Sequence, residues 1–471
     1  MATADTRVIN ARVVTPSGTI NGGIAATDGT ITAVGATSSL PDAAETIDAE
    51  GNYLIPGFIC PHNHMGISRF ENEYHDQYEL DMETETRACL AGGVTSFFTF
   101  LLQEEPYIPD MDFFVETGEE QSYIDFGFHA IIHQDHHIDE LEGLAEEGVR
   151  SFKLFFNMYK VSAPELGIGH SDAGRVYEVL DRTADIEDAV VMFHAENDDL
   201  GTKKVEELKE SGRDDLSAWA DASPGISQAM QIEQIGMLTD YTDATSYVVH
   251  NSMKETVDAL ERYKDRGVDI HGETLPSFLA NHCEEEDVGV WGKISPPVGY
   301  EDDQQAIWKA LRNGTFDHVG TDHCPYQLEF KGPRDGSVWD SPPGDQGLQT
   351  FLPLMLCDGV NKNRISIERM VEVCSTNNAK RFGIYPRKGA LVEGADADAV
   401  IVDLTKEITV DEELLYGLDN RWCSAFGRTL TGAPTHTIKG GELVVEDNEI
   451  LSENGIGSYL PRYETGVELP N

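Results

Sequence analysis

Six side chains that can bind or bridge metal ions each follow a short apolar run of this chain. They are His62, His64, Lys153, His194, His250 and Asp322. His62 and His64 are two residues apart, and such residues point to the same side of an extended chain, so both imidazoles could bind one metal. Nitrogen and oxygen ligands without a thiolate suit zinc, manganese, iron or cobalt. The order of these residues therefore predicts a metal-dependent catalytic site.

Lys153 is the unusual member of this set. An ammonium group cannot bind a cation, so Lys153 would first have to react with carbon dioxide. The carbamate that results is an anionic oxygen donor, which can bridge two metals. A carbamate on Lys153 would therefore indicate a binuclear site.

The residues that must position this site form a repeating pattern between residues 56 and 384, in which strand-like segments alternate with segments of helical composition. Eight strands are predicted, at Phe58–Cys60, Ser96–Leu101, Phe126–Ile132, Val149–Phe155, Val190–Phe193, Tyr247–His250, Val268–His271 and Val319–Asp322. Helices are predicted at Met82–Ala91, Gly174–Thr183 and Lys254–Arg266. This alternation is typical of a parallel sheet, and eight repeats predict a closed (β/α)8 barrel. Catalytic groups of such barrels come from the carboxyl ends of the strands, where the six residues fall.

The two ends of the chain have a different character. Residues 1–55 and 385–471 contain short strand-like runs separated by glycine turns, for example Gly22-Gly23 and Gly440-Gly441. We expect these two parts to build one small β-sandwich domain together, beside a barrel domain of residues 56–384.

The charge of the chain excludes several classes of partner. With 84 Asp and Glu against 34 Lys and Arg the formal charge is −50, so neither nucleic acid nor an anionic membrane is expected to bind. The acids are spread over the whole length, which is typical of adaptation to a salt-rich cytoplasm, where self-repulsion is screened; an ordinary acidic protein is the alternative. No apolar stretch approaches the roughly 20 residues of a membrane span, and no secretory leader is evident. We therefore expect a cytoplasmic protein of a salt-adapted cell.

Cysteine usage adds one exclusion. The seven cysteines are scattered and form no Cys-x-x-Cys pair, which argues against a disulfide framework or a thiolate zinc site. We expect most of them to be buried thiols.

Several segments together resemble the cyclic amidohydrolases, and most closely the dihydropyrimidinases and hydantoinases, whose relatives include dihydroorotase and allantoinase. The segments that contain the six residues are Cys60–His64, Ser151–Phe155, Phe193–Asn197, Val248–His250 and Gly320–Pro325. Further likeness occurs at Gly272–Thr274, Ser295–Pro297, Ser375–Gly389 and Gly394–Asp398. The resemblance thus covers most of the chain.

This resemblance implies a binuclear hydrolase that opens a cyclic amide or imide ring. It implies that His62, His64 and Asp322 bind one metal, that His194 and His250 bind the other, and that carbamylated Lys153 bridges them. Zinc is the favoured metal, with manganese, iron and cobalt left open. A hydroxide between the metals would attack the ring carbonyl while Asp322 moves the proton to the leaving nitrogen. The family also implies a homotetramer.

Three departures from the family pattern bear on the substrate. Cys60 stands where the family usually has an aspartate that orients the first histidine, so we expect weaker metal binding. The hydantoinases have a tyrosine, an oxyanion donor, five residues after the lysine, where this chain has Met158 and then Tyr159. Ser295 keeps its expected contact with substrate, whereas Pro343 replaces a usual asparagine in the substrate loop. We predict Tyr159 as a catalytic residue, with Ser295, Tyr159 and Pro343 at the substrate.

Other interpretations stay open at this point. The chain could open another ring, as allantoinase or dihydroorotase does, although Arg69 lies too far from His62 for the dihydroorotase pattern. It could also be a non-catalytic barrel, which the retention of all six residues argues against. Taken alone, each histidine would more often be a packed or surface residue, and Asp322 a helix cap. We assign the histidines at 133, 136 and 137 to a solvated loop, with accessory substrate contact as the alternative.

Overall fold

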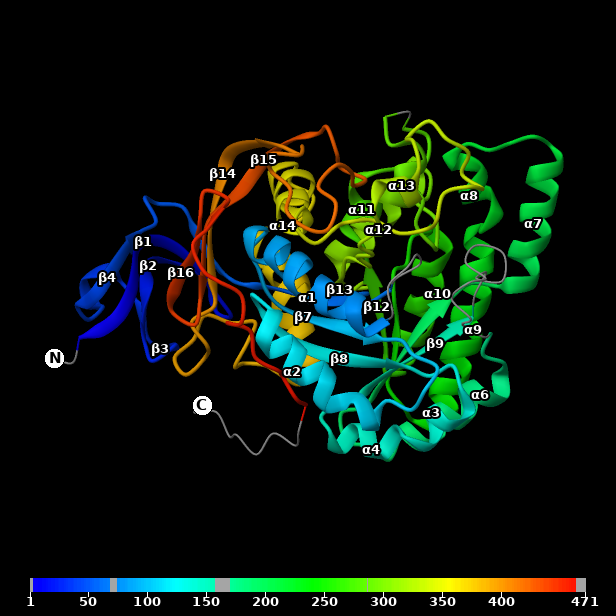
Figure 1. Cartoon of the computed structure of the whole chain (residues 1–471), viewed down its shortest axis with the longest axis horizontal. Coiled ribbons are helices and arrows are strands. Elements are labelled where there is room, and N and C mark those ends of the chain that lie inside the picture. The colour runs from blue at the N-terminus through cyan, green and yellow to red at the C-terminus, as the bar shows by residue number, and fades with distance from the viewer. Residues whose placement is uncertain (1–2, 68–73, 157–169, 286, 463–471) are drawn as a thin grey trace.

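The computed structural model describes residues 3–67, 74–156, 170–285 and 287–462. It contains two sheets, one of nine strands and one of eight, and the eight-stranded sheet forms a barrel (Figure 1). Its strands run in chain order and all neighbours are parallel: β6 (Phe58–Asn63), β7 (Val94–Leu101), β8 (Asp125–Ile131), β9 (Ser151–Phe156), β10 (Val190–Ala195), β11 (Ser246–Val248), β12 (Ile270–Thr274) and β13 (His318–Val319). All eight predicted strands are present, and the (β/α)8 fold is confirmed.

Backbone hydrogen bonds between the first strand and the segment after the last strand close this barrel. The amide of His64 donates to the carbonyl of His323 at 2.9 Å, and the amide of Asp322 donates to the carbonyl of His62 at 2.9 Å. The residues that join the two edges of the sheet are thus the candidate metal ligands or their direct neighbours.

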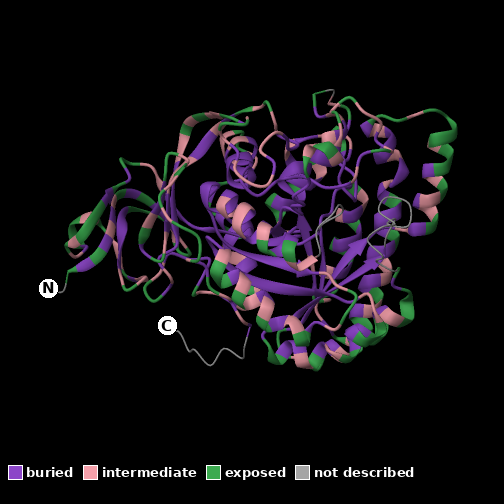
Figure 2. Cartoon of the chain, in the orientation of Figure 1, coloured by how far each residue is buried: buried purple, intermediate pink, exposed green. Residues whose placement is uncertain are grey.

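The barrel strands are buried on both faces, as Figure 2 shows for the central strands. Strand β7 illustrates the cause, because its apolar run is continuous and successive side chains point to opposite faces. Phe98 and Phe100 pack in the cluster inside the barrel, while Phe97 and Leu101 pack in the cluster under the helices.

Helices cover the outside of the barrel. Those that matter below are α1 (Tyr74–Ala91), α3 (Asp135–Asp139), α6 (Ala173–Thr183), α7 (Asp198–Glu210), α9 (Gly225–Thr242) and α10 (Lys254–Lys264). The three predicted helices correspond to α1, α6 and α10. In the described part of the chain, no helix is both long and apolar enough to cross a membrane.

Both ends of the chain contribute to the nine-stranded sheet. The N-terminal end supplies β1 (Ala4–Thr15), β2 (Gly18–Thr27), β3 (Thr30–Gly35), β4 (Ala43–Asp48) and β5 (Tyr53–Pro56). The C-terminal end supplies β14 (Ala399–Thr409), β15 (Thr429–Lys439), β16 (Glu442–Glu446) and β17 (Glu449–Ile450). Strands β5 and β14 pair antiparallel, and apolar residues of both ends, such as Leu54 and Ile401, share one core. The predicted union of the two ends is confirmed, while the domain boundaries at residues 55/56 and 384/385 stay a prediction.

A buried ionic cluster lies where the nine-stranded sheet contacts the barrel. Lys388 donates to Asp125 at the start of β8 and to Asp398, the latter at 2.6 Å. Lys439 of β15 donates to Asp125 at 2.8 Å. Although burial alone would raise it, the pKa of Asp125 is lowered because Lys388 and Lys439 stabilise the carboxylate. The charges are therefore matched inside the protein.

All seven cysteines are free thiols, and all but Cys357 are buried, as expected from their scattered positions.

Candidate metal centre

The first three predicted ligands meet at the carboxyl ends of β6 and β13. Nε2 of His62 and Nε2 of His64 each lie 3.0 Å from the same oxygen, Oδ1 of Asp322. Asp322 adopts a left-handed backbone, with φ of 51°, which a residue other than glycine seldom adopts. Such strain is common at functional sites, where the surrounding structure enforces it.

The same three residues polarise one another. Burial favours the neutral form of Asp322, but the rings of His62 and His64 outweigh it and hold the pKa of this carboxyl well below its ordinary value. Burial also lowers the pKa of His64 to about 4. At neutral pH the group is therefore a carboxylate beside an imidazole with a lone pair, which is a donor set for a cation.

The other three predicted ligands border this group. The rings of His250 and His62 lie 5.3 Å apart and those of His250 and His194 lie 4.6 Å apart, measured between centroids. Lys153 lies in β9, where its Nζ is 5.1 Å from the centroid of the Phe100 ring, which itself packs against the rings of His62 and His64. The structure thus brings all six residues to one end of the barrel.

Lys153 lies in an unusual environment for a lysine. Its side chain is buried among aromatic rings, and burial lowers its pKa to about 7, against the opposing attraction of Asp322 and Glu273. Near neutral pH a large fraction of the protein molecules therefore have Lys153 as a neutral amine. A neutral amine is the form that attacks carbon dioxide.

The donor set fits divalent metal ions. Ligand atoms of a zinc ion lie about 2.0–2.2 Å from it, so atoms 3.0 Å apart can share one cation. Nδ1 of His250 is buried without a hydrogen-bond partner among the described residues. Unpartnered buried polar atoms are costly, and a bound cation would satisfy them.

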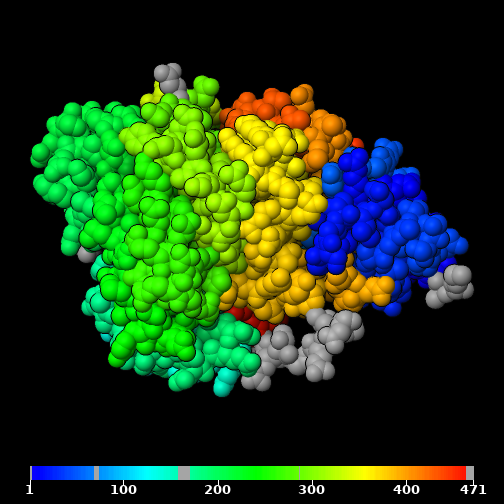
Figure 3. All heavy atoms as spheres, turned by 180° about the vertical axis from the view of Figure 1, so that it is seen from behind, coloured from blue at the N-terminus to red at the C-terminus, as the bar shows by residue number. Residues whose placement is uncertain are grey.

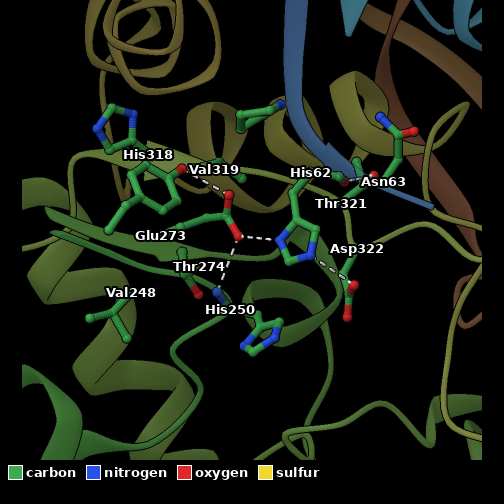
Figure 4. Close-up of polar contacts among 12 residues, drawn as sticks. His62, Asn63, Val248, His250, Glu273, Thr274, His318, Val319, Thr321 and Asp322 are labelled. Atoms are coloured by element: carbon green, nitrogen blue, oxygen red, sulfur yellow. Dashed lines mark hydrogen bonds and ion pairs between the residues drawn. The ribbon is translucent and has the colours of Figure 1, made fainter. Parts of the chain in front are cut away.

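Sequence reasoning did not assign a role to Glu273, at the carboxyl end of β12. Its buried carboxylate accepts a hydrogen bond from Nδ1 of His62 at 2.7 Å, from the hydroxyl of Tyr247 at 2.8 Å and from the amide of His250 at 3.1 Å (Figure 4). A carboxylate on the second nitrogen of a ligating histidine fixes its tautomer and strengthens it as a ligand. The position of Glu273 at a strand end was the available signal.

The hydrogen bond between His62 and Glu273 also bears on the role of Cys60. The thiol lies 3.2 Å from the carbonyl oxygen of His62 and 3.2 Å from Oγ1 of Thr321, and burial raises its pKa to about 11. Cys60 therefore does not orient the His62 ring. Glu273 orients this ring instead, through the hydrogen bond with Nδ1 of His62.

Glu196 has a similar position beside the second group. It accepts a hydrogen bond from Nε2 of His194 at 2.5 Å, so Nδ1 is the nitrogen that would bind a metal. Ser223 donates to the same carboxylate, and so does Ser295 at 3.0 Å. Ser295 and His194 thus contact the same carboxylate, that of Glu196, and Ser295 lies at the border of the centre.

Other predicted site residues have different outcomes. Tyr159 and Met158 lie outside the described residues, as does Arg69. Pro343 is buried in the irregular segment after β13, where the neighbouring Gly344 packs against Cys324. Because proline has no amide hydrogen, Pro343 can offer substrate only its carbonyl and its ring.

The histidines after β8 are not a solvated loop, and that prediction was wrong for His137. This residue is buried in α3, its ring packs 4.5 Å from that of Tyr107, and its Nε2 lies 3.2 Å from the carbonyl of Glu105. His133 is half-buried and only His136 is exposed. The polar sequence around His137 does not indicate that the ring of Tyr107 covers this residue.

A second group of potential ligand atoms lies at the amino ends of β12 and β13. His271, Asp317 and His318 each offer an atom within 4.8 Å of the others. However, Arg381 donates to His271 and Lys264 donates to Asp317. These cationic groups already neutralise the cluster, so we assign no metal to it.

Comparisons with known proteins agree with this geometry. The model of the amidohydrolase family matches residues 53–444. An L-hydantoinase of Paenarthrobacter aurescens is 31% identical over 97% of this chain and 98% of its own length. A D-hydantoinase of Geobacillus stearothermophilus is 30% identical over 97% and 96%, and an allantoinase of Deinococcus radiodurans is 30% identical over 86% and 88%.

Solved structures give the same result. The L-hydantoinase (dihydropyrimidinase) from Arthrobacter aurescens superimposes with a TM-score of 0.89 at 28% identity, over 98% of this chain and 100% of the other. Dihydropyrimidinase from Brevibacillus agri superimposes with a TM-score of 0.87 at 28% identity, over 97% and 98%. The family match spans the whole barrel and its ligand-bearing strands, and the chain belongs to the amidohydrolase family.

Proposed function

We propose that this amidohydrolase opens the ring of a dihydropyrimidine or a hydantoin by hydrolysing a cyclic amide bond. The observation that carries the proposal is the convergence of six side chains at the carboxyl end of the barrel, with two imidazoles 3.0 Å from one carboxylate oxygen. The full-length likeness to hydantoinases and a dihydropyrimidinase supports the substrate class.

In this proposal the six residues would hold two divalent metal ions, with zinc as the favoured metal. His62, His64 and Asp322 would hold one ion, His194 and His250 would hold the other, and the carbamate of Lys153 would bridge them. Two bound cations would supply a more acidic water molecule and polarise the ring carbonyl. The carbamate forms when the neutral amine of Lys153 bonds to carbon dioxide and releases a proton.

Side chains of this protein position the reaction and move the proton. Glu273 fixes the tautomer of His62, and Glu196 fixes that of His194. Asp322, ionised because its pKa is depressed, accepts the proton of the attacking water and gives it to the ring nitrogen as the carbon–nitrogen bond breaks. Ser295 and the segment at Pro343 would contact the ring, and Tyr159 would donate to the carbonyl oxygen.

The test is hydrolysis of a panel of dihydrouracil, hydantoin, 5-substituted hydantoins, allantoin and dihydroorotate in molar KCl. The enzyme is supplied with zinc or manganese and with bicarbonate. We expect activity on the first three substrates. Activity confined to allantoin would favour the second candidate, allantoin ring opening, which the allantoinase relatives support. Metal-loaded protein that cleaves none of the five would contradict the ring-opening proposal.

Glu273→Gln tests the role of this carboxylate toward the metal. Glutamine keeps the shape but loses the charge that supports His62, so we expect metal affinity to fall by roughly 10- to 100-fold. Competition with a chromophoric chelator measures the affinity directly, without an activity assay. Tyr247→Phe, which removes only one hydrogen bond to Glu273, serves as the matched control with a smaller effect. Unchanged affinity in Glu273→Gln would remove Glu273 from the metal centre.

We further propose a homo-oligomer, a tetramer by likeness to the family, in the cytoplasm of a salt-adapted cell. The charge of −50 supports adaptation to salt. Because dilute buffer leaves this repulsion unscreened, we expect loss of the native circular dichroism spectrum when KCl is lowered from molar to about 10 mM. A fold and melting temperature that do not change with KCl concentration would refute the adaptation.

A further inference from the structure

The outer face of α9 is apolar and exposed. Ile226, Met230, Met237 and Tyr241 show solvent-exposed fractions of 54%, 47%, 58% and 77%. Tyr177 of the neighbouring helix α6 adds its ring, whose centroid lies 6.1 Å from that of Tyr241. Of the eight exposed large hydrophobic residues in the described part of the chain, five lie here. Such a concentration is typical of an interaction surface, whereas scattered single residues are not.

The spacing of these residues makes the face symmetric. The intervals between the four residues of α9 are four, seven and four residues, which keeps all of them on one side of the helix. The pattern is centred between Glu233 and Gln234. A second α9 that runs antiparallel across a two-fold axis at this centre would place Ile226 against Tyr241 and Met230 against Met237. Self-complementarity of this kind is the requirement of an isologous interface.

Charge also favours a second copy of the chain at this face. The net charge of −50 makes most surfaces of two copies repel each other. On α9 the only charged residues are Glu233 and Asp240, which receive hydrogen bonds from Arg262 and Arg266 of α10. Both charges of α9 are therefore paired, whereas the carboxylate of Asp181 lies beside Tyr177 of α6 at the edge of the face.

The position and size of the face suit such a contact. The helices coloured green in Figure 3, which include α9 and α10, form a flank of the molecule away from the blue and orange nine-stranded sheet. Helix α9 has 18 residues and is about 27 Å long. Stable interfaces bury about 1,200–2,000 Å² in total, so the adjoining surfaces of α6 and α10, which pack beside α9, would contribute to the contact.

We propose that two copies of this chain associate through α9, antiparallel, across a two-fold axis between Glu233 and Gln234. The contact assigns a surface to the homo-oligomer but does not depend on the catalytic proposal, because its residues point away from the metal centre. Loss of association would therefore leave metal binding in place, and a failed substrate test would leave the association in place.

The first test is the molar mass in solution, measured by light scattering on full-length protein in molar KCl. The double variant Met230→Glu/Met237→Glu places four acidic groups at the symmetric contact, and we expect the mass to fall to half that of the parent. Leu451→Glu, at an exposed position next to β17 of the nine-stranded sheet, is the matched control and should keep the parental mass. A monomeric parent, or a double variant with the parental mass, would overturn the proposal.

Cysteine cross-linking tests the antiparallel register, because the native cysteines are buried apart from half-buried Cys357. Met230→Cys and Met237→Cys proteins, distinguished by a size tag, are mixed and oxidised mildly. Antiparallel pairing predicts the mixed disulfide as the main product, with little product from either protein alone. A parallel pairing would instead join each cysteine to its own counterpart and would contradict the two-fold axis.

Discussion

Lys153→Ala is expected to lose hydrolytic activity by about 10³-fold or more, together with bound metal. Lys153 is buried beside the two groups of imidazoles, and alanine leaves no group that can become an anionic bridge between two cations. Stabilisation by a bound metal is worth several kcal/mol of the activation barrier, which corresponds to about three orders of magnitude in rate. Turnover of the best panel substrate and metal content by mass spectrometry give the two readouts.

Two further variants make this experiment specific. Lys153→Glu restores a carboxylate near the bridging position and should regain part of the metal content. Lys203→Ala removes an exposed lysine that pairs with Glu206 on the surface of α7, and it should match the parent. Full activity and full metal content in Lys153→Ala would show that the centre does not use Lys153.

Lys388→Met is expected to lower the free energy of unfolding by about 3 to 5 kcal/mol. Methionine keeps much of the side-chain volume but removes the charge that neutralises Asp125 and Asp398, and breaking a buried ion pair from one side is strongly destabilising. Denaturant unfolding in molar KCl measures the difference. The loss should be much larger than for an exposed pair, because solvent cannot compensate the buried carboxylates.

The pH dependence and a control separate this effect from a simple packing defect. The pKa of Asp125 is depressed in the folded parent, so its contribution is present above the ordinary value of about 4 and is lost as the pH falls through the depressed one. The deficit of Lys388→Met should therefore shrink at acid pH. Lys406→Met, which removes a pair with exposed Asp447, should cost roughly 1 kcal/mol or less. An equal loss in both variants would contradict the electrostatic explanation.

The barrel and its six candidate ligands were predictable because both depend on local sequence. Apolar runs of strand length, such as Ser96–Leu101, are bounded by turn residues, and each candidate ligand lies within such a run or close to its end. Family motifs then ordered the ligands. The nine-stranded sheet was predictable in the same way, since both ends of the chain contain short strand-like runs separated by turn residues.

The supporting role of Glu273 was not predictable because this residue acts across a large separation in sequence. Glu273 contacts His62 over 211 residues, and only the closure of the barrel brings β12 near β6. The sequence shows the departure at Cys60 but not this distant carboxylate, and the weaker metal binding expected from Cys60 stays a prediction. The burial of His137 was not predicted for the same reason, since Tyr107, 30 residues earlier in the chain, covers its ring.

The hydrogen bonds that close the barrel also have a consequence for folding. They join His62 and His64 to Asp322 and His323, at about 260 residues of sequence separation, so the chain entropy lost in making this contact is among the largest in the fold. Contacts of such range form slowly and late. Amide hydrogens of these residues would exchange with solvent whenever the barrel edge opens. Cations bound by residues of both edges would stabilise the closed barrel and so favour this last step of folding.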